Sequence, residues 1–146
     1  MADHGSGSID IAASAAEIMH VIADFDHYQD WAGPVRRCRV LETDAAGMPG
    51  RVHFAVHFMG IGDEYVNAYT WYGDERVTWS LVEGNSLKLQ EGSYILTPKG
   101  STTLVEYDLT VELKVPLPGL IRRRAQGAII DSALKDLKKA VEGKTR

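Results

Sequence analysis

The chain has 146 residues, 45% of them apolar, and a formal net charge of −4 at pH 7 with an isoelectric point near 5.7. This length allows one domain with a substantial core, while the acidic balance argues against a nucleic-acid-binding domain and against general attraction to anionic membranes. Cys38 is the only cysteine, so an internal disulfide is excluded as well.

The sequence carries no pattern typical of a targeting signal or a membrane span. Its apolar runs are shorter than the roughly 20 residues that a spanning helix needs. The opening letters, MADHGSGS, are polar and small rather than apolar. We therefore expect a cytoplasmic protein with a single domain over residues 8–143, preceded by a flexible segment over residues 1–7.

The predicted domain opens with a strand and a capped helix. Residues 8–12 alternate between polar and apolar side chains, as a short strand does. Ser14 is followed three residues later by Glu17, which is the pair that forms a capping box at a helix start. Residues 26–31 predict one further helical turn before Gly33-Pro34 ends it. The apolar stripe of the first helix consists of Ile18, Val21, Ile22 and Phe25.

The middle of the chain predicts a sheet, because strand patterns follow one another with only short turns between them. Connections this short make neighbouring strands antiparallel. The predicted strands lie at about 35–44, 50–58, 63–72, 76–83, 86–97 and 102–114.

A long helix over residues 116–143 closes the predicted domain, with Pro118 near its start and Gly143 just past its last apolar residue. Its second half carries an apolar stripe. At 3.6 residues per turn, the same side of the first half of the helix carries an arginine, a glutamine and a glycine where a core would have apolar side chains. We therefore expect the first half to roof a cavity and the second half to seal it. The apolar stripe is Ile130, Ala133, Leu134, Leu137 and Val141, and the residues on the same side of the first half are Arg123, Gln126 and Gly127.

One face of the predicted sheet carries aromatic rings with polar ends. A buried hydroxyl or amide without a partner costs about 1–3 kcal/mol, so several together favour a wet or liganded pocket over a dry core. The pattern leaves open which face of the strand at 63–72 points inward. With one choice, the inward side chains of the sheet include Phe54, Val56, Phe58, Tyr65, Asn67, Tyr69, Trp71, Trp79, Leu81, Tyr94 and Tyr107.

Four segments in this order and spacing, SIDIAASAAEIMHVIADF, FDHYQDW, GSYILTPKGSTTLVEYDL and VPLPG, resemble the START/Bet v 1-like (SRPBCC) superfamily, and within it the polyketide cyclase/dehydrase-like group. The resemblance implies an α+β helix-grip fold. In that fold a curved seven-stranded antiparallel sheet wraps around a long C-terminal helix, with a short helix pair after the first strand. Members bind lipids, polyketides, hormones and quinones in a hydrophobic cavity, and some are enzymes. Aromatase/cyclase members carry an arginine on the strand that reads EYVNAYT here, where Tyr69 stands at the matching inward position.

Other site chemistries have no support in the sequence. The histidine and acidic residues around the first helices match no metal-ligand spacing. No Ser-His-Asp signature, phosphate loop or dinucleotide fingerprint is present. We therefore expect neither a metal nor a cofactor.

These patterns predict a carrier or sensor that binds a small hydrophobic molecule, such as a lipid, a quinone or a polyketide-like compound, between the sheet and the terminal helix. The alternative is a polyketide cyclase/dehydratase-type enzyme with Tyr69 and Arg123 as candidate catalytic residues. Residues 59–62 form a candidate lid. We expect no nucleic acid and no stable membrane insertion, and the oligomeric state stays open. The predicted ligand contacts are Phe54, Val56, Phe58, Tyr65, Asn67, Tyr69, Trp71, Trp79, Leu81, Tyr94, Tyr107, Arg123, Gln126, Gly127 and Ile130.

Overall fold

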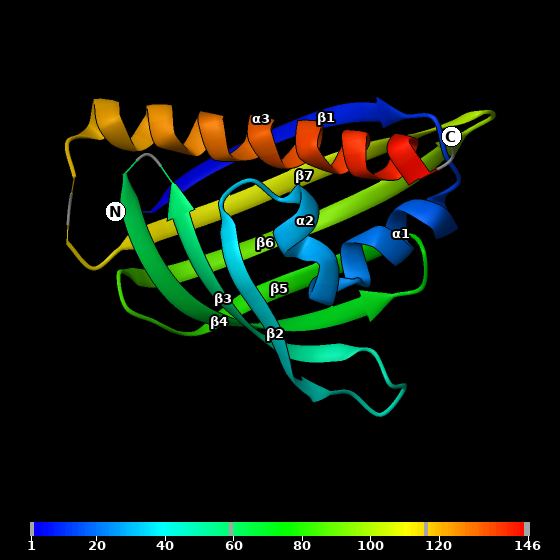
Figure 1. Cartoon of the computed structure of the whole chain (residues 1–146). Coiled ribbons are helices and arrows are strands. Elements are labelled where there is room, and N and C mark those ends of the chain that lie inside the picture. The colour runs from blue at the N-terminus through cyan, green and yellow to red at the C-terminus, as the bar shows by residue number, and fades with distance from the viewer. Residues whose placement is uncertain (1, 59, 116, 145–146) are drawn as a thin grey trace.

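The computed structural model describes residues 2–58, 60–115 and 117–144 (Figure 1). Over these ranges the chain forms one antiparallel sheet whose concave side holds the helices. The elements in chain order are β1 (Asp3–Ile11), α1 (Ala15–Ala23), the 3₁₀ turn η1 (Phe25–His27), α2 (Tyr28–Trp31), β2 (Val35–Thr43), β3 (Pro49–Phe58), β4 (Ile61–Tyr72), β5 (Arg76–Gly84), β6 (Leu87–Lys99), β7 (Thr102–Leu113) and α3 (Gly119–Lys144).

The sheet has seven strands in the order β1-β7-β6-β5-β4-β3-β2. Strands β2 to β7 form a meander, and β1 pairs with β7 at the far edge. The long helix α3 lies along the β1 side, η1 and α2 pack against β2, and α1 lies beside α3 (Figure 1). This confirms the predicted helix-grip arrangement of one sheet, a short helix pair and a long closing helix.

The capping box that the sequence predicts at the start of α1 is present. Ser14 Oγ accepts from the Glu17 backbone N–H at 3.1 Å, and Glu17 Oε1 accepts from the Ser14 N–H at 3.4 Å. Two backbone donors that the helix leaves without partners are thereby satisfied. The cap fixes the direction of α1, whose buried face then packs beside α3.

The predicted flexible segment is wrong for residues 3–7, because β1 begins at Asp3 and pairs with β7 from Val111 onward. The glycines that resemble a linker face the terminal helix. A Cβ placed on Gly5 would lie 2.7 Å from Ile130 Cδ1, and one on Gly7 would lie 2.9 Å from Ile130 Cγ2. Glycine at these positions therefore allows the close approach of α3 to β1, because a larger residue would displace the Ile130 side chain.

The terminal helix begins at Gly119 and runs to Lys144, and Pro116, where the prediction placed its start, lies outside the described residues. The Pro118 carbonyl accepts from the Arg122 N–H at 3.1 Å, so Pro118 stands immediately before the first turn. Gly143 lies inside the helix rather than beyond it. The buried face of α3 is formed by Gln126, Ile130, Leu134, Leu137 and Val141.

Two groups of buried apolar side chains flank the concave face. The larger joins α1 and the second half of α3 to strands β5, β6 and β7, with Ile18, Val105 and Leu137 fully buried. The smaller lies under β2 and β3 and contains Phe25 and Phe54. The concave face between these groups is where space remains for a ligand.

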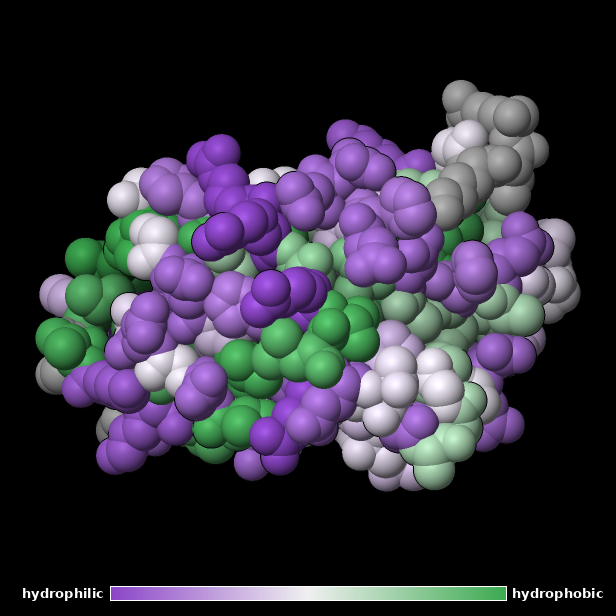
Figure 2. Space-filling view, turned by 60° about the horizontal axis from the view of Figure 1, so that its bottom comes forward, coloured by the Kyte–Doolittle hydropathy of each residue, from purple (hydrophilic) through white to green (hydrophobic). Residues whose placement is uncertain are grey.

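Exposed apolar side chains gather at the end of the molecule where α3 begins, at the left of Figure 2. Ile61 at the start of β4 is 58% exposed, and Val115, Leu120 and Ile121 around the start of α3 are 72%, 64% and 51% exposed. Residue 59 of the candidate lid lies outside the described residues. None of the helices in the described ranges is both long enough and apolar enough to cross a membrane.

Candidate functional site

The concave face of the sheet encloses a cavity of about 400 Å³, roofed by α3 and closed at one end by α1 and α2. This volume lies within the range of small-molecule sites in proteins. Its lining is mostly aromatic and aliphatic. The cavity brings together these predicted ligand contacts: Phe54, Val56, Phe58, Tyr65, Asn67, Tyr69, Trp79, Tyr94, Tyr107 and Gln126.

The sheet wall of the cavity is a continuous series of ring contacts. Phe54 stacks on Tyr65 with centroids 5.2 Å apart, and Tyr94 stacks on Tyr107 at 4.8 Å. Trp79 connects the two groups, at 5.7 Å from Tyr69 and 5.8 Å from Tyr107. The strands place these rings on one face because side chains two residues apart point the same way. The result is a continuous and largely aromatic wall.

Two predicted sheet contacts do not line the cavity. Trp71 points inward, but its Nε1 donates to the Pro49 carbonyl at 2.7 Å and its ring stacks on Tyr69 at 5.8 Å. It therefore supports the aromatic wall instead of facing a ligand. Leu81 pairs with Asn67 across the strands but packs near Gly84, beyond the cavity lining.

The predicted cavity face of α3 is wrong by about one residue. Arg123 and Gly127 are exposed, and Ile130 is buried against the glycines of β1. The apolar stripe in the second half of α3 faces β1 and α1. Residues on the same side of the first half therefore lie toward β1 and not toward the cavity. The helix residues that do line the cavity are Ile121, Arg122, Ala125, Gln126, Ile129, Ala133 and Asp136.

The signal that marks this face was present in the sequence. Ile121, Ala125, Ile129 and Ala133 recur every four residues, which places them on one side of a helix. Their alternation of large and small side chains leaves space beside the helix. The neighbouring stripe that begins at Ile130 is more strongly apolar, so it dominates the helical pattern in the sequence.

The cavity also receives Tyr28 and Trp31 from α2, neither of which was predicted as a ligand contact. Their rings lie 4.7 Å apart, and the Tyr28 hydroxyl donates to the Ile22 carbonyl. This contact ties α2 to α1 and turns Trp31 toward the cavity. The segment FDHYQDW therefore supplies part of the cavity wall.

A polar group lies in this apolar wall around Asn67, which is 2% exposed. Asn67 Nδ2 donates to Gln90 Oε1 at 2.8 Å, and no hydrogen-bond partner for Asn67 Oδ1 occurs among the described residues. Burial raises the pKa of Tyr65 and Tyr69 well above 10, and hydrogen bonds from Gln90 and Asn67 oppose that rise only in part. Both hydroxyls therefore stay protonated at neutral pH and can donate to a ligand oxygen.

A charged pair lies at the end of the cavity where α3 begins. Arg122 Nε is 2.9 Å from Asp3 Oδ2, and the same guanidinium donates to the Leu117 carbonyl at 3.0 Å. Both charged side chains line the cavity and are about one-fifth exposed. Further along, Gln126 Nε2 donates to the Leu109 carbonyl at 2.9 Å, which ties α3 to β7. Arg122 thus takes the ligand-facing position expected for Arg123.

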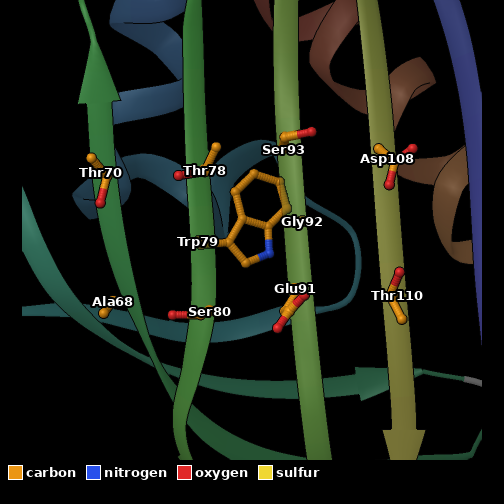
Figure 3. Close-up of a pocket in the computed structure, with 10 residues that line it drawn as sticks. All are labelled: Ala68, Thr70, Thr78, Trp79, Ser80, Glu91, Gly92, Ser93, Asp108 and Thr110. Atoms are coloured by element: carbon orange, nitrogen blue, oxygen red, sulfur yellow. The ribbon is translucent and has the colours of Figure 1, made fainter. Parts of the chain in front are cut away.

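The opposite face of the sheet carries a shallow groove of about 360 Å³, open to solvent (Figure 3). Its lining consists mainly of short hydroxyl side chains such as Thr70, Thr78 and Ser93. In Figure 3 the indole of Trp79 reaches across β6 at Gly92, which has no side chain. Trp79 lines both the groove and the inner cavity. It therefore forms the partition between them, and the apolar cavity is the better candidate site.

The family of the chain follows from a match over almost its whole length. Residues 3–142 match the family described as polyketide cyclase/dehydrase and lipid transport. The chain belongs to this family. A START superfamily protein from Mycobacterium smegmatis is 27% identical, with a TM-score of 0.90 over 96% of this chain and 97% of that chain. No curated protein sequence gives a significant match.

Solved structures with lower sequence identity share the same architecture. A protein from Thermus thermophilus is 22% identical, with a TM-score of 0.86 over 99% of this chain and 100% of that one. The Zhui aromatase/cyclase from Streptomyces sp. R1128 is 15% identical, with a TM-score of 0.84 over 100% and 97%. At these identities the likeness shows the fold alone.

The polyketide cyclase/dehydrase and lipid transport family includes both enzymes and carriers, as its description says, so the residues of this cavity must decide between them. Tyr69 lines the cavity, at the position where the resemblance places an arginine in aromatase/cyclases. Within the described ranges, no three histidine, cysteine or acidic side chains come together as metal ligands.

Proposed function

We propose that the chain is a carrier or sensor that binds a small hydrophobic molecule, of the lipid, quinone or polyketide-like class, in the cavity under α3. The observation that carries this proposal is the cavity itself, about 400 Å³ and enclosed by apolar and aromatic side chains. Protein interiors normally pack as densely as organic crystals, so side chains would fill this space if it were only part of the core. An apolar ligand is the natural occupant of such a space.

The polar groups of the cavity favour a ligand with a polar end. Arg122 and Asp3 lie at the α3 end, while Asn67 and the hydroxyls of Tyr65 and Tyr69 lie on the sheet wall. When an apolar cavity contains only a small number of polar groups, these groups determine the orientation of a ligand more than its affinity. An elongated or planar molecule with an oxygen-bearing group fits this distribution.

Filling the cavity tests the proposal. Ala125 lies on the cavity face of α3, so Ala125→Trp should occupy the space and weaken binding of the probe 8-anilinonaphthalene-1-sulfonate about tenfold or more, or ~1.4 kcal/mol. Lys139→Trp places the same side chain on the exposed face of α3 and serves as the control. Probe fluorescence measures affinity, and circular dichroism checks folding. Equal affinity in both variants would show that the cavity is not the binding site.

A second candidate function, a polyketide cyclase/dehydratase-type enzyme, is favoured by one observation. Burial raises the pKa of Tyr69 well above 10, which makes it a weak acid but keeps its hydroxyl protonated, so it can donate a hydrogen bond to a ligand carbonyl as negative charge develops on that oxygen. Arg123, the other candidate catalytic residue, is exposed and outside the cavity. An enzyme would therefore depend on Tyr69.

The variant Tyr69→Phe separates the two functions. Removing one hydrogen-bond donor from a developing oxyanion costs about 10²–10³-fold, so an enzyme should lose that factor in kcat on a poly-β-keto substrate analogue, with binding largely kept. A carrier shows a change in affinity alone, without product from either protein. Tyr72→Phe is the control, because Tyr72 is 44% exposed on the outer face.

A further inference from the structure

We propose that the mouth of the cavity docks reversibly on the surface of an anionic lipid bilayer. The docking surface consists of Ile61, Val115, Leu120 and Ile121, together with Arg123 and Arg124. The proposal goes beyond ligand binding, because it assigns the protein a location at a membrane surface. It also requires no knowledge of which ligand the cavity takes.

The apolar part of the docking surface is strongly exposed. Its four side chains are 51% to 72% exposed, above the 40% to 44% of the other large exposed apolar residues among those described. Burying each such side chain in an apolar medium is favourable, because the area it removes from water is large. A cluster of this kind marks an interaction site more often than a chance exposure. Figure 2 shows hydrophobic residues on the surface at this end of the molecule, with hydrophilic residues beside them.

The docking surface lies at the cavity mouth. Ile61 and Ile121 line the cavity while remaining more than half exposed. Leu117, between the strand and the helix, lines it as well. A bilayer that covers these residues would therefore face the cavity opening directly. A hydrophobic ligand could then pass between bilayer and cavity without crossing water.

The charge of this region has the opposite sign to that of the whole chain. From residue 113 to 130 the sequence contains Lys114 and the run Arg122-Arg123-Arg124, with no Asp or Glu until Asp131. Arg123 and Arg124 are exposed on α3 next to Leu120 and Ile121. Basic residues that flank exposed apolar ones are typical of peripheral binding to anionic membranes.

The acidic side chains near the mouth already have partners. Asp3 pairs with Arg122 at 2.9 Å, and Glu64 lies 3.1 Å from His53 Nε2. Asp63 Oδ1 accepts from the backbone N–H groups of Glu64 and Ser86. The ion pair with Arg122 offsets the negative charge of Asp3, and the other contacts hold Asp63 and Glu64 in place on β4. A bilayer is favoured over a protein partner because the exposed apolar residues come from three separate segments, the β3–β4 hairpin, the loop after β7 and the first turn of α3, with basic residues beside them.

Vesicle co-sedimentation of the full chain tests this proposal. The protein should bind vesicles of phosphatidylcholine mixed with phosphatidylglycerol, and bind those of phosphatidylcholine alone much more weakly. High salt should weaken the binding, because part of the attraction is electrostatic. The double variant Arg123→Ala/Arg124→Ala should reduce partitioning to the anionic vesicles about 30-fold, since each surface arginine contributes roughly a factor of five. The double variant Val115→Asp/Leu120→Asp should abolish it.

Matched variants elsewhere on the molecule control for nonspecific effects. Val82 and Ile95 are 42% and 40% exposed on the outer sheet face, so Val82→Asp/Ile95→Asp should leave vesicle binding unchanged. Arg37→Ala/Arg39→Ala on β2 removes two exposed arginines away from the mouth. It should reduce binding less than twofold.

Three results would overturn the proposal. The wild-type protein fails to bind anionic vesicles, or the control variants lose binding as much as the mouth variants do. The third result would be a wild-type dimer, seen by light scattering, that the double variant Val115→Asp/Leu120→Asp converts to a monomer, with no vesicle binding by the wild type or the variant. That result would assign the surface to a second copy of the chain.

Discussion

Trp79 and Gly92 together separate the inner cavity from the groove on the outer face of the sheet. They are direct partners on β5 and β6, and the indole of Trp79 lies over the Gly92 backbone. A Cβ on Gly92 would lie 2.3 Å from Trp79 Cζ2, far inside contact distance. Gly92 continues the strand without a bulge, so its role is to make room for the indole.

The variant Gly92→Ala should therefore destabilise the protein by roughly 1–3 kcal/mol, because the ring must move out of a packed wall. Urea denaturation measures the loss. Ser93→Ala, which changes the neighbouring side chain on the outer face, should stay within about 0.5 kcal/mol. Wild-type stability in Gly92→Ala would show that the indole has a second favourable position.

At the residue scale, the sequence predicted most of the sheet residues that line the cavity. A strand has a period of two, so one correct choice of inward face places Tyr65, Asn67 and Tyr69 together. It could not predict that Trp71 is held back by the Pro49 carbonyl, since that hydrogen bond depends on a strand 22 residues away in the sequence.

At the element scale, the position of α3 depends on β1. The glycines of β1 allow Ile130 to come close, which turns the apolar stripe toward β1 and leaves the cavity to Arg122, Ala125 and Ile129. A helix turns about 100° per residue, so an error of one position exchanges Arg122 for Arg123. The sequence predicted the helix, but its rotation depended on a strand that reads as a linker.

Adding a side chain to β1 tests this dependence. A Cβ on Gly7 would lie 2.9 Å from Ile130 Cγ2 and 3.2 Å from Leu134 Cδ1, so Gly7→Val should cost roughly 1–3 kcal/mol of stability. Ser6→Val adds the same side chain on the exposed side of β1 and should change stability by less than about 0.5 kcal/mol. A flexible segment here would instead give wild-type stability in both variants, measured by urea denaturation.

Gly127 gives a prediction of the opposite sign. It lies within α3, is exposed, and a Cβ there would have no atom within 4 Å. Gly127→Ala should therefore stabilise the protein by about 0.5–1 kcal/mol, because alanine loses less backbone entropy in a helix. Thermal unfolding measures the gain. Probe binding should not change, and weaker binding would indicate that Gly127 makes room for the ligand after all.

At the scale of the whole molecule, the buried tyrosines link stability to pH. Burial raises the folded-state pKa of Tyr28, Tyr65, Tyr69, Tyr94 and Tyr107 above the ordinary value of 10.0. Above about pH 10 the unfolded chain releases these protons while the folded chain keeps them. The free energy of unfolding therefore falls as the pH rises, by about 1.4 kcal/mol per pH unit for each tyrosine.

Urea denaturation at a series of pH values above neutral measures this fall. The full stabilisation should be present below about pH 10 and be lost above it, with tyrosinate absorbance appearing together with unfolding. Tyrosinate from several residues at unchanged far-ultraviolet circular dichroism would contradict the burial of these hydroxyls. Bound ligand should shift the loss to higher pH, because it binds only the folded state.

The whole fold was predictable because each level of the sequence agrees with it: a capping box, alternating strands, short turns and an apolar terminal helix. The lining of the cavity was predictable only on the sheet. Its roof depends on the contact of Gly5 and Gly7 with Ile130, which joins the two ends of the chain and leaves no periodic signal in either.

The ion pair between Asp3 and Arg122 has a practical consequence for every experiment above. It fixes the first residues of β1 beside the cavity mouth, while α3 ends at the opposite end of the molecule (Figure 1). An affinity tag fused before Asp3 would project over the mouth and compete with ligand or bilayer. Tags therefore belong at the carboxyl terminus. A small fluorophore attached at the amino terminus would instead report directly when the mouth is covered.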